Sequence, residues 1–284
     1  MRDIHLPGRS TARAANAMAA TSQPSSTLAA LEILQAGGNA LDAAIAACAV
    51  QCVTEPGSTG VGGDCFCLYQ PAGAAAPIAF NGSGRAPGKA ELAYFRDQGM
   101  TALDPASAHV VTVPGAVDAW ATLSADHGKL GLERLLQPAI RYAEDGFVVH
   151  ERTAYDFAGA AGKLAKDEGA KATYFNGSGK PPEAGDLLRQ PALARTLKAI
   201  AAKGRDAFYE GAVAEDIVKT LKAKGGLHEL ADFAEAAGEY VDPIRTNYRG
   251  YDIFECPPNG VGVIALLMLN IVEALPVSND PLAV

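Results

Sequence analysis

Cysteine thiols are the first side chains in this sequence that could act as metal ligands or nucleophiles. The five cysteines are Cys48, Cys52, Cys65, Cys67 and Cys256. Cys65 and Cys67 are two residues apart, so on a strand they would share a face and could form half of a metal site. No second pair has zinc-like spacing, and free cysteine is among the most buried residue types. We therefore interpret the cysteines as buried, reduced thiols and expect neither a metal nor a cofactor.

Histidines and carboxylates show no spacing typical of an active site. Of the five histidines, His109 and His150 are the least obviously on solvated helix faces, but no Ser/His/Asp constellation can be ordered around them. Adjacent carboxylates such as Glu144 and Asp145 would point to different faces of a helix. A glycosidase site with two carboxylates is therefore not predicted.

A glycine-rich segment, residues 57–63 (GSTGVGG), invites comparison with a phosphate-binding loop. Such a loop follows a strand and opens a helix, and a P-loop also needs Gly-Lys-Ser or Gly-Lys-Thr. Here the segment follows an expected helix and precedes an expected strand. We interpret it as a turn with unusual backbone angles and not as a nucleotide site.

Hydrophobic periodicity and capping residues predict the elements that position these side chains. A helix is expected from about Ser25 to Ala36, and Asn39 is expected to cap a second, core helix with Asp42 three positions on. Further helices are expected at 116–127, 131–145, 191–203, 212–224 and 260–274, and strands at 65–69, 77–80, 110–113 and near 247–255. Long helices mixed with strands, without strict alternation, predict an α+β or layered sandwich fold.

Composition and charge restrict the class of protein. The chain has 284 residues, 49% of them hydrophobic and 20% charged, which is typical of a globular protein with a substantial core. A net charge of -8 without a basic block argues against nucleic acid as a partner. The apolar stretches 43–53 and 261–271 are short of the roughly 20 residues of a membrane-spanning helix, so no membrane partner is expected. The charged amino terminus, residues 1–9, differs from a secretory leader and predicts a cytoplasmic protein.

One stretch differs in composition from the rest of the chain. Between residues 150 and 190 the sequence becomes richer in Lys, Gly and Pro, which predicts a surface excursion or the edge of a subdomain. No repeat of fixed period is present, so a solenoid or propeller is not predicted.

A series of short motifs resembles the large subunit of the γ-glutamyltransferases (γ-glutamyltranspeptidases). The first two are AGGNALDAA at 36–44 and EPGSTGVGGDCF at 55–66. Further matches follow in the family's order: RAP at 85–87, VPG at 113–115, QPAI at 137–140, GF at 146–147, FYEG at 208–211, DP at 242–243 and YRGY at 248–251. The resemblance runs from about Ala20 to Glu273, and the ordered series makes it specific.

The resemblance implies the four-layer αββα sandwich of N-terminal nucleophile hydrolases, with residues 1–284 as the large-subunit part of a single two-chain domain. In that family a precursor cleaves itself, and the new amino-terminal threonine of the downstream fragment is the nucleophile. Its own α-amino group is the base that a weakly nucleophilic hydroxyl needs. The implied partner is a small subunit from the same precursor, and no catalytic residue is expected in this chain.

The implied activity is amide hydrolysis or acyl transfer on a small-molecule amide or γ-glutamyl substrate, as in glutathione metabolism. An alternative is a catalytically inactive relative that kept the fold as a binding or scaffolding protein after losing the nucleophile. A threonine or serine at a cleavage junction beyond Val284 would separate the two hypotheses.

The resemblance also points to substrate-binding residues. Family members bind the glutamyl α-carboxylate through the arginine of a FRExAP segment, which corresponds here to NGSGRAP at 81–87. Ser83 occupies the arginine position, and Arg85 is displaced by two residues, which preserves its facing on a strand. Arg85 is thus either a carboxylate ligand or an ordinary surface arginine. The replacement favours small amides such as oxamate. The family's PPSSGG segment is PPNGVG at 257–262, where Asn259 is expected to cap the final helix.

Overall fold

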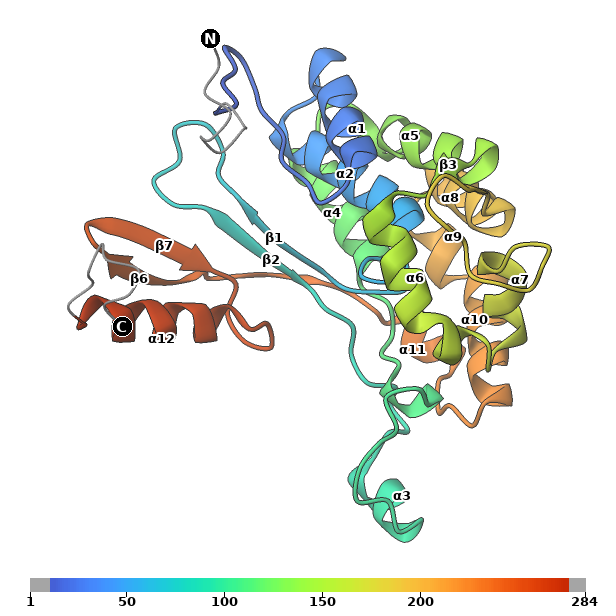
Figure 1. The fold of residues 1–284 in the computed structure, drawn as a ribbon. Helices are drawn as coiled ribbons and strands as arrows, with labels where there is room; N and C mark the ends of the chain where they lie inside the picture. Colours follow the sequence, from blue (N-terminus) through green and yellow to red (C-terminus); the bar gives the residue numbers. More distant parts are fainter. Residues whose placement is uncertain (1–10, 276–284) are drawn as a thin grey trace.

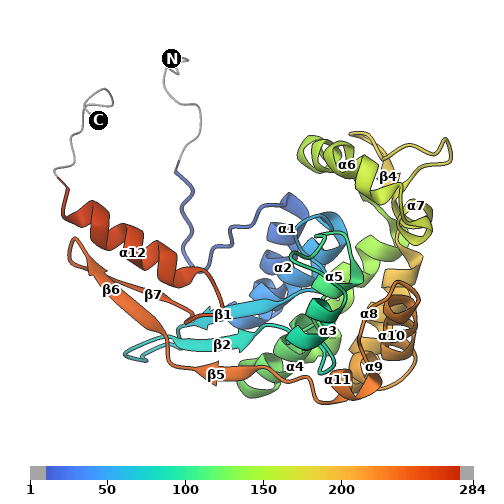
Figure 2. The ribbon, with the colours of Figure 1, turned by 90° about the horizontal axis from the view of Figure 1, so that it is seen from below.

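The computed structural model describes residues 11–275 as a helical body, a three-stranded sheet and a projecting arm (Figures 1 and 2). The helices are α1 (Pro24–Gln35), α2 (Ala40–Thr54), α3 (Leu92–Asp97), α4 (Ala116–His127), α5 (Gly131–Asp145), α6 (Glu151–Leu164), α7 (Glu168–Tyr174), α8 (Pro191–Lys203), α9 (Asp206–Tyr209), α10 (Ala212–Ala223), α11 (Leu230–Ala234) and α12 (Gly262–Glu273). The strands are β1 (Cys65–Tyr69), β2 (Ile78–Gly82), β3 (Phe147–Val148), β4 (Leu187–Leu188), β5 (Glu239–Val241), β6 (Ile244–Tyr248) and β7 (Tyr251–Glu255). This mixture confirms the α+β class.

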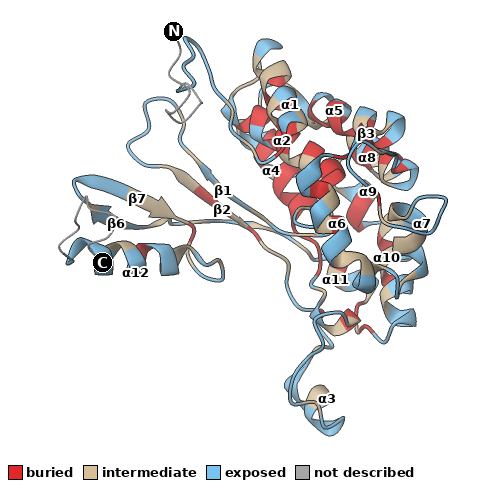
Figure 3. Ribbon diagram, in the orientation of Figure 1, coloured by how far each residue is buried: buried red, intermediate tan, exposed pale blue. Residues whose placement is uncertain are grey.

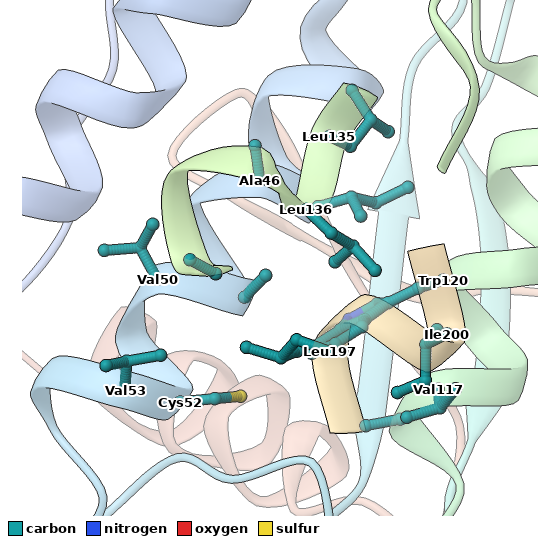
Figure 4. Close-up of a cluster of buried hydrophobic side chains, with 14 of the residues drawn as sticks. Ala46, Val50, Cys52, Val53, Val117, Trp120, Leu135, Leu136, Leu197 and Ile200 are labelled. Atoms are coloured by element: carbon teal, nitrogen blue, oxygen red, sulfur yellow. The ribbon is translucent and has the colours of Figure 1, made fainter. Parts of the chain in front are cut away.

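The core lies where α2, α4, α5 and α8 meet (Figure 4). On α2, Ala46, Val50 and Val53 are fully buried, which confirms that this nearly all-apolar helix is a core helix. Trp120 of α4 and Leu197 of α8 pack into the same cluster. This core fixes the helical body against which the sheet is laid.

The start of α2 is held by the capping pair expected from the sequence. Asn39 Oδ1 accepts a hydrogen bond from Asp42 N, and Asn39 N donates to Asp42 Oδ2, both at 2.9 Å. Asp42 is fully buried, and Lys129 N donates to its Oδ2 at 3.0 Å. Gly128 allows this approach, because a Cβ there would lie 2.8 Å from Asp42 Oδ1. The cap therefore also joins α2 to the turn between α4 and α5.

The sheet has the order β1-β2-β5, with both pairings antiparallel. Cys67 pairs with Phe80, and Phe80 pairs with Tyr240 on the other side. One face of the sheet packs on the helices. On β1, Phe66 and Leu68 alternate with the less exposed residues and are 41% and 40% exposed. Helix α4 contacts β1 and β2, and Figure 3 shows that much of β1 is exposed.

The arm consists of the β6–β7 hairpin with α12 packed across it (Figure 1). Tyr248 pairs with Tyr251 around Arg249 and Gly250, which have φ angles of 51° and 86°. The sequence predicted one strand near 247–255. That prediction is corrected, because the left-handed Arg249-Gly250 pair turns the chain back and produces two strands.

Most other expected elements are confirmed. The helices expected at 116–127, 131–145 and 191–203 have those bounds in the structure. The strand expected at 110–113 is wrong. The segment begins with the 3-10 turn Ala108–Val110, and Val113 N donates to Arg85 O at 2.9 Å without forming a ladder. Within residues 150–190 the chain forms α6 and α7, which the sequence did not predict.

Candidate substrate-binding site

A groove of about 440 Å³ lies at the end of β2, where three distant segments meet. It is lined by the end of β2 and the residues after it, the residues before and at the start of β5, and the loop between β7 and α12: Asn81, Ser83, Gly84, Arg85, Ala86, Ala237, Glu239, Pro258 and Asn259. Ser83 and Arg85, the two residues that sequence analysis singled out, both line it. The fold therefore brings the NGSGRAP and PPNGVG segments together across 178 positions of the chain.

The backbone on the inner side of the groove is closely packed. A Cβ at Gly84 would lie 1.7 Å from Val113 O, and a Cβ at Gly115 would lie 2.2 Å from Gly82 O. These positions accept no side chain without backbone movement. The glycines of the GSG and VPG motifs thus hold Ser83 and Arg85 at a fixed place on the rim.

The end of the glycine-rich segment 57–63 and the residue after it bond to the backbone beside the groove. Gly63 O accepts hydrogen bonds from Gly115 N and Ala116 N, each at 3.0 Å, at the start of α4. The next residue, Asp64, accepts from Gly84 N at 2.8 Å through Oδ1. Gly63 O therefore occupies two N–H groups at the start of α4, in agreement with the interpretation of the segment as a structural turn.

Three polar residues form a closed hydrogen-bonded ring on the rim, through their side chains and the backbone N–H of Ser83. Ser83 N donates to Asn81 Oδ1 at 3.1 Å, Asn81 Nδ2 donates to Asn259 Oδ1 at 3.1 Å, and Asn259 Nδ2 donates to Ser83 Oγ at 2.7 Å. The sequence predicted that Asn259 caps α12, and this prediction is wrong. Val261 is the residue before the helix, and the Asn259 amide is engaged by β2 and the residue after it.

Arg85 projects from the rim as an exposed side chain. Within residues 11–275, no acidic side chain lies within 4.0 Å of its guanidinium. The groove also contains the carboxylate of Glu239. Its two formal charges are therefore of opposite sign. Whether Arg85 binds a substrate carboxylate stays a prediction.

A buried ion pair that the sequence did not reveal holds one wall of the groove. Arg205 Nε lies 2.6 Å from Oδ1 of Asp118, whose side chain is 6% exposed, and Gly238 N donates to Asp118 Oδ2 at 2.7 Å. The Arg205 guanidinium also donates to Ala236 O and lies 4.5 Å from the ring centre of Tyr209. These contacts fix residues 236–238 against α4. The FYEG motif, which contains Tyr209, was the available sign of this site.

Tyr209 links the same network to the VPG motif. Its hydroxyl donates to Pro114 O at 2.7 Å and accepts from Asp118 N at 3.1 Å. Burial raises the pKa of Tyr209 above its ordinary value, so the phenol stays protonated and keeps its donor role. Motifs that are 95 positions apart are therefore joined by one buried side chain.

Within residues 11–275, the cysteines and histidines lie outside the groove. All five cysteines are free thiols, and burial raises the pKa of Cys65 to about 12 and of Cys67 to about 11. His109 packs against the rings of Tyr94 and Phe95. His228, which sequence analysis did not single out, is fully buried with Nε2 2.8 Å from Val111 O, and burial lowers its pKa. These contacts are structural.

Comparison with known proteins places this geometry in context. The model of the Gamma-glutamyltranspeptidase family matches residues 26–283. The chain is 38% identical over 241 residues to the "Glutathione hydrolase-like YwrD proenzyme" of Bacillus subtilis, covering 85% of this chain and 46% of that protein. It is 34% identical over 252 residues to the "Oxamate amidohydrolase proenzyme" of Klebsiella pneumoniae, covering 87% and 47%.

A solved structure shows the same fold. The chain superposes on Helicobacter pylori gamma-glutamyltranspeptidase with a TM-score of 0.88 at 29% identity, covering 97% of this chain and 80% of that one. The fold implied by the resemblance is therefore confirmed. The chain spans about half the length of the curated relatives it matches.

Proposed function

This chain belongs to the gamma-glutamyltranspeptidase family, and we propose that it is the non-nucleophilic, large-subunit part of an N-terminal nucleophile amidohydrolase. The nucleophile is the amino-terminal threonine of a second fragment, which self-cleavage of a common precursor releases. Two findings support this division. The chain matches about half of its relatives, and those relatives are named proenzymes.

The observation that carries the proposal is an unpartnered apolar surface. Six apolar residues on α12 or flanking it are each more than half exposed: Val261, Ile264, Leu267, Met268, Ile271 and Leu275. Figure 3 shows that α12 is mostly exposed. The outer face of β1 adds Phe66 and Leu68, and β1 is an edge of its sheet. Large exposed apolar patches and open strand edges mark contact surfaces. A small subunit that adds strands and covers α12 would complete the layers, as one two-chain domain.

The proposed reaction is amide hydrolysis or acyl transfer. The threonine Oγ attacks the amide carbonyl while its α-amino group takes the hydroxyl proton, which then passes to the departing amine. The resulting ester is released by water or by an acceptor amine. The part of the present chain is to bind the acyl end of the substrate in the groove at Ser83 and Arg85.

For the substrate we propose a small amide such as oxamate in preference to a γ-glutamyl compound such as glutathione. Ser83 stands where the family has its carboxylate-binding arginine, so the α-amino acid end of a glutamyl group loses its charged partner. The names of the two relatives, one glutathione hydrolase-like and one oxamate amidohydrolase, support both substrate classes.

The location in the cell stays a prediction. Among residues 11–275, no helix is both long and apolar enough to cross a membrane. The expected cytoplasmic location depends on residues 1–9, which lie outside the described residues.

Self-cleavage of the full-length gene product tests the proposal. We expect the purified protein to convert with time into two co-purifying fragments on a denaturing gel, with threonine as the first residue of the smaller one by amino-terminal sequencing. A variant with alanine in place of that threonine is the matched control and should stay uncut. A wild-type protein that hydrolyses amides as one uncut chain contradicts the proposal, and a stable uncut, inactive protein favours the scaffold alternative.

A further inference from the structure

The polar ring on the groove rim has a fixed direction. A backbone N–H can only donate, so the Ser83 N contact identifies Oδ1 as the atom of Asn81 that faces it, at 3.1 Å. The Asn81 amide nitrogen therefore faces Asn259 and must meet its oxygen, at 3.1 Å. This leaves the Asn259 nitrogen to donate to Ser83 Oγ, at 2.7 Å. One unambiguous donor thus fixes the orientation of both amides.

The direction of the ring decides what the Ser83 hydroxyl can do. A serine hydroxyl has one proton and two acceptor lone pairs. Because Asn259 occupies a lone pair, the proton must point elsewhere, and within residues 11–275 no acceptor for it is found. Ser83 is half-buried and lines the groove, so its free O–H is available to a bound molecule. The site therefore presents a donor, and it suits a ligand with an acceptor oxygen.

We propose that Asn259 is a positioning residue that fixes the Ser83 hydroxyl as a hydrogen-bond donor to a carboxylate or carbonyl oxygen on the acyl part of the substrate. This inference rests on the proposed function and extends it to the chemistry of recognition. Asn259 comes from the loop before α12, whereas Ser83 follows β2, so the donor exists when the arm is docked on the body.

The groove contains few alternatives for this role. Arg85 supplies the one guanidinium of the groove lining, and the Glu239 carboxylate offsets its charge. A neutral donor such as Ser83 accepts a carbonyl as well as a carboxylate. Because Ser83 and Arg85 both line the groove, a short acyl group with two adjacent oxygen functions, such as that of oxamate, is the ligand that we expect to use both.

The test uses the full-length, self-cleaved protein and two readouts. Hydrolysis of oxamate and of glutathione gives KM and kcat separately, and calorimetric titration with oxalate, the acid product of oxamate hydrolysis, gives binding without turnover. The variants are Ser83→Ala, Asn259→Ala, Asn259→Asp and the double variant Ser83→Ala/Asn259→Ala. Asn247→Ala is the matched control, since Asn247 is an exposed asparagine of the β6–β7 hairpin whose amide bonds to Asp252 at 3.0 Å, away from the groove.

We expect Ser83→Ala and Asn259→Ala each to raise KM and the oxalate Kd by about three- to tenfold, the range for one lost hydrogen bond, with kcat changed by less than about twofold. The double variant should be no worse than Ser83→Ala, because Asn259 acts through that hydroxyl. Asn259→Asp keeps the shape but cannot donate, and it adds a negative charge beside an anionic ligand, so it should raise KM at least as much as Asn259→Ala. Asn247→Ala should behave as wild type.

Several results would overturn the inference. They are wild-type KM in Asn259→Ala, wild-type behaviour in Asn259→Asp, and effects of Ser83→Ala and Asn259→Ala that multiply in the double variant. Wild-type protein that neither binds nor hydrolyses either compound also overturns it. If self-cleavage is absent but oxalate binds with the expected variant pattern, the proposed function fails while the inference stands.

Discussion

Replacing Arg205 with alanine should destabilise the protein far more than removing a surface arginine. Asp118 would lose the partner 2.6 Å from its Oδ1 while its side chain stays 6% exposed, and its contact with Gly238 N would remain. Removing one member of a buried pair costs about 3–5 kcal/mol. Because the Arg205 side chain is 24% exposed, water can partly replace it, and we expect the low end of that range, about 3 kcal/mol.

Thermal unfolding monitored by circular dichroism measures this effect. For a chain of this size, about 3 kcal/mol corresponds to a fall in Tm of about 6–12 °C. Arg141→Ala is the matched control. Arg141 pairs with Glu32 at 3.1 Å with side chains 52% and 36% exposed, so its loss should cost at most about 1 kcal/mol. Equal Tm values for the two variants would refute the assignment of the Asp118–Arg205 pair as the support of the groove wall.

Two further predictions concern reactivity and specificity. Iodoacetamide should label Cys65 and Cys67 slowly at pH 8 and leave turnover nearly intact. Their raised pKa values of about 12 and 11 keep both thiols protonated until the pH approaches those values. Mass spectrometry and activity assays check this, and rapid inactivation with labelling at either residue would contradict it. Ser83→Arg should raise glutathione turnover by about ten- to a hundredfold, the value of an arginine–carboxylate contact. Arg85→Ala should weaken oxamate hydrolysis selectively. Efficient wild-type glutathione hydrolysis that Arg85→Ala leaves unchanged would refute both expectations.

Local signals in the sequence predicted the elements whose ends they define. The Asn39–Asp42 cap and the helix at 116–127 are both confirmed by the structure, because capping and periodicity act over a few residues. The error at 110–113 has a different origin. Its β-branched residues suit a strand, but the chain forms the 3-10 turn Ala108–Val110 there, and Val113 N bonds to Arg85 O outside any strand pairing.

The groove was predictable in part. Ser83 and Arg85 follow from the position of one motif, and both line it. The role of Asn259 and the Asp118–Arg205 pair did not follow, because each depends on contacts between residues 176 and 87 positions apart. Spacing rules describe one helix or one strand, and they carry no information on which loops meet in space.

The loop between β7 and α12 has a consequence for when the protein becomes able to recognise a substrate. Asn259 is carried by the arm, and the arm's apolar helix face is the surface proposed to receive the small subunit. Docking of that subunit on α12 would fix the position of the arm. Because the arm carries Asn259, it would also fix the orientation of the Ser83 hydroxyl. The groove would then gain its ability to bind substrate only when the two subunits assemble, although every residue of the groove rim is present before assembly.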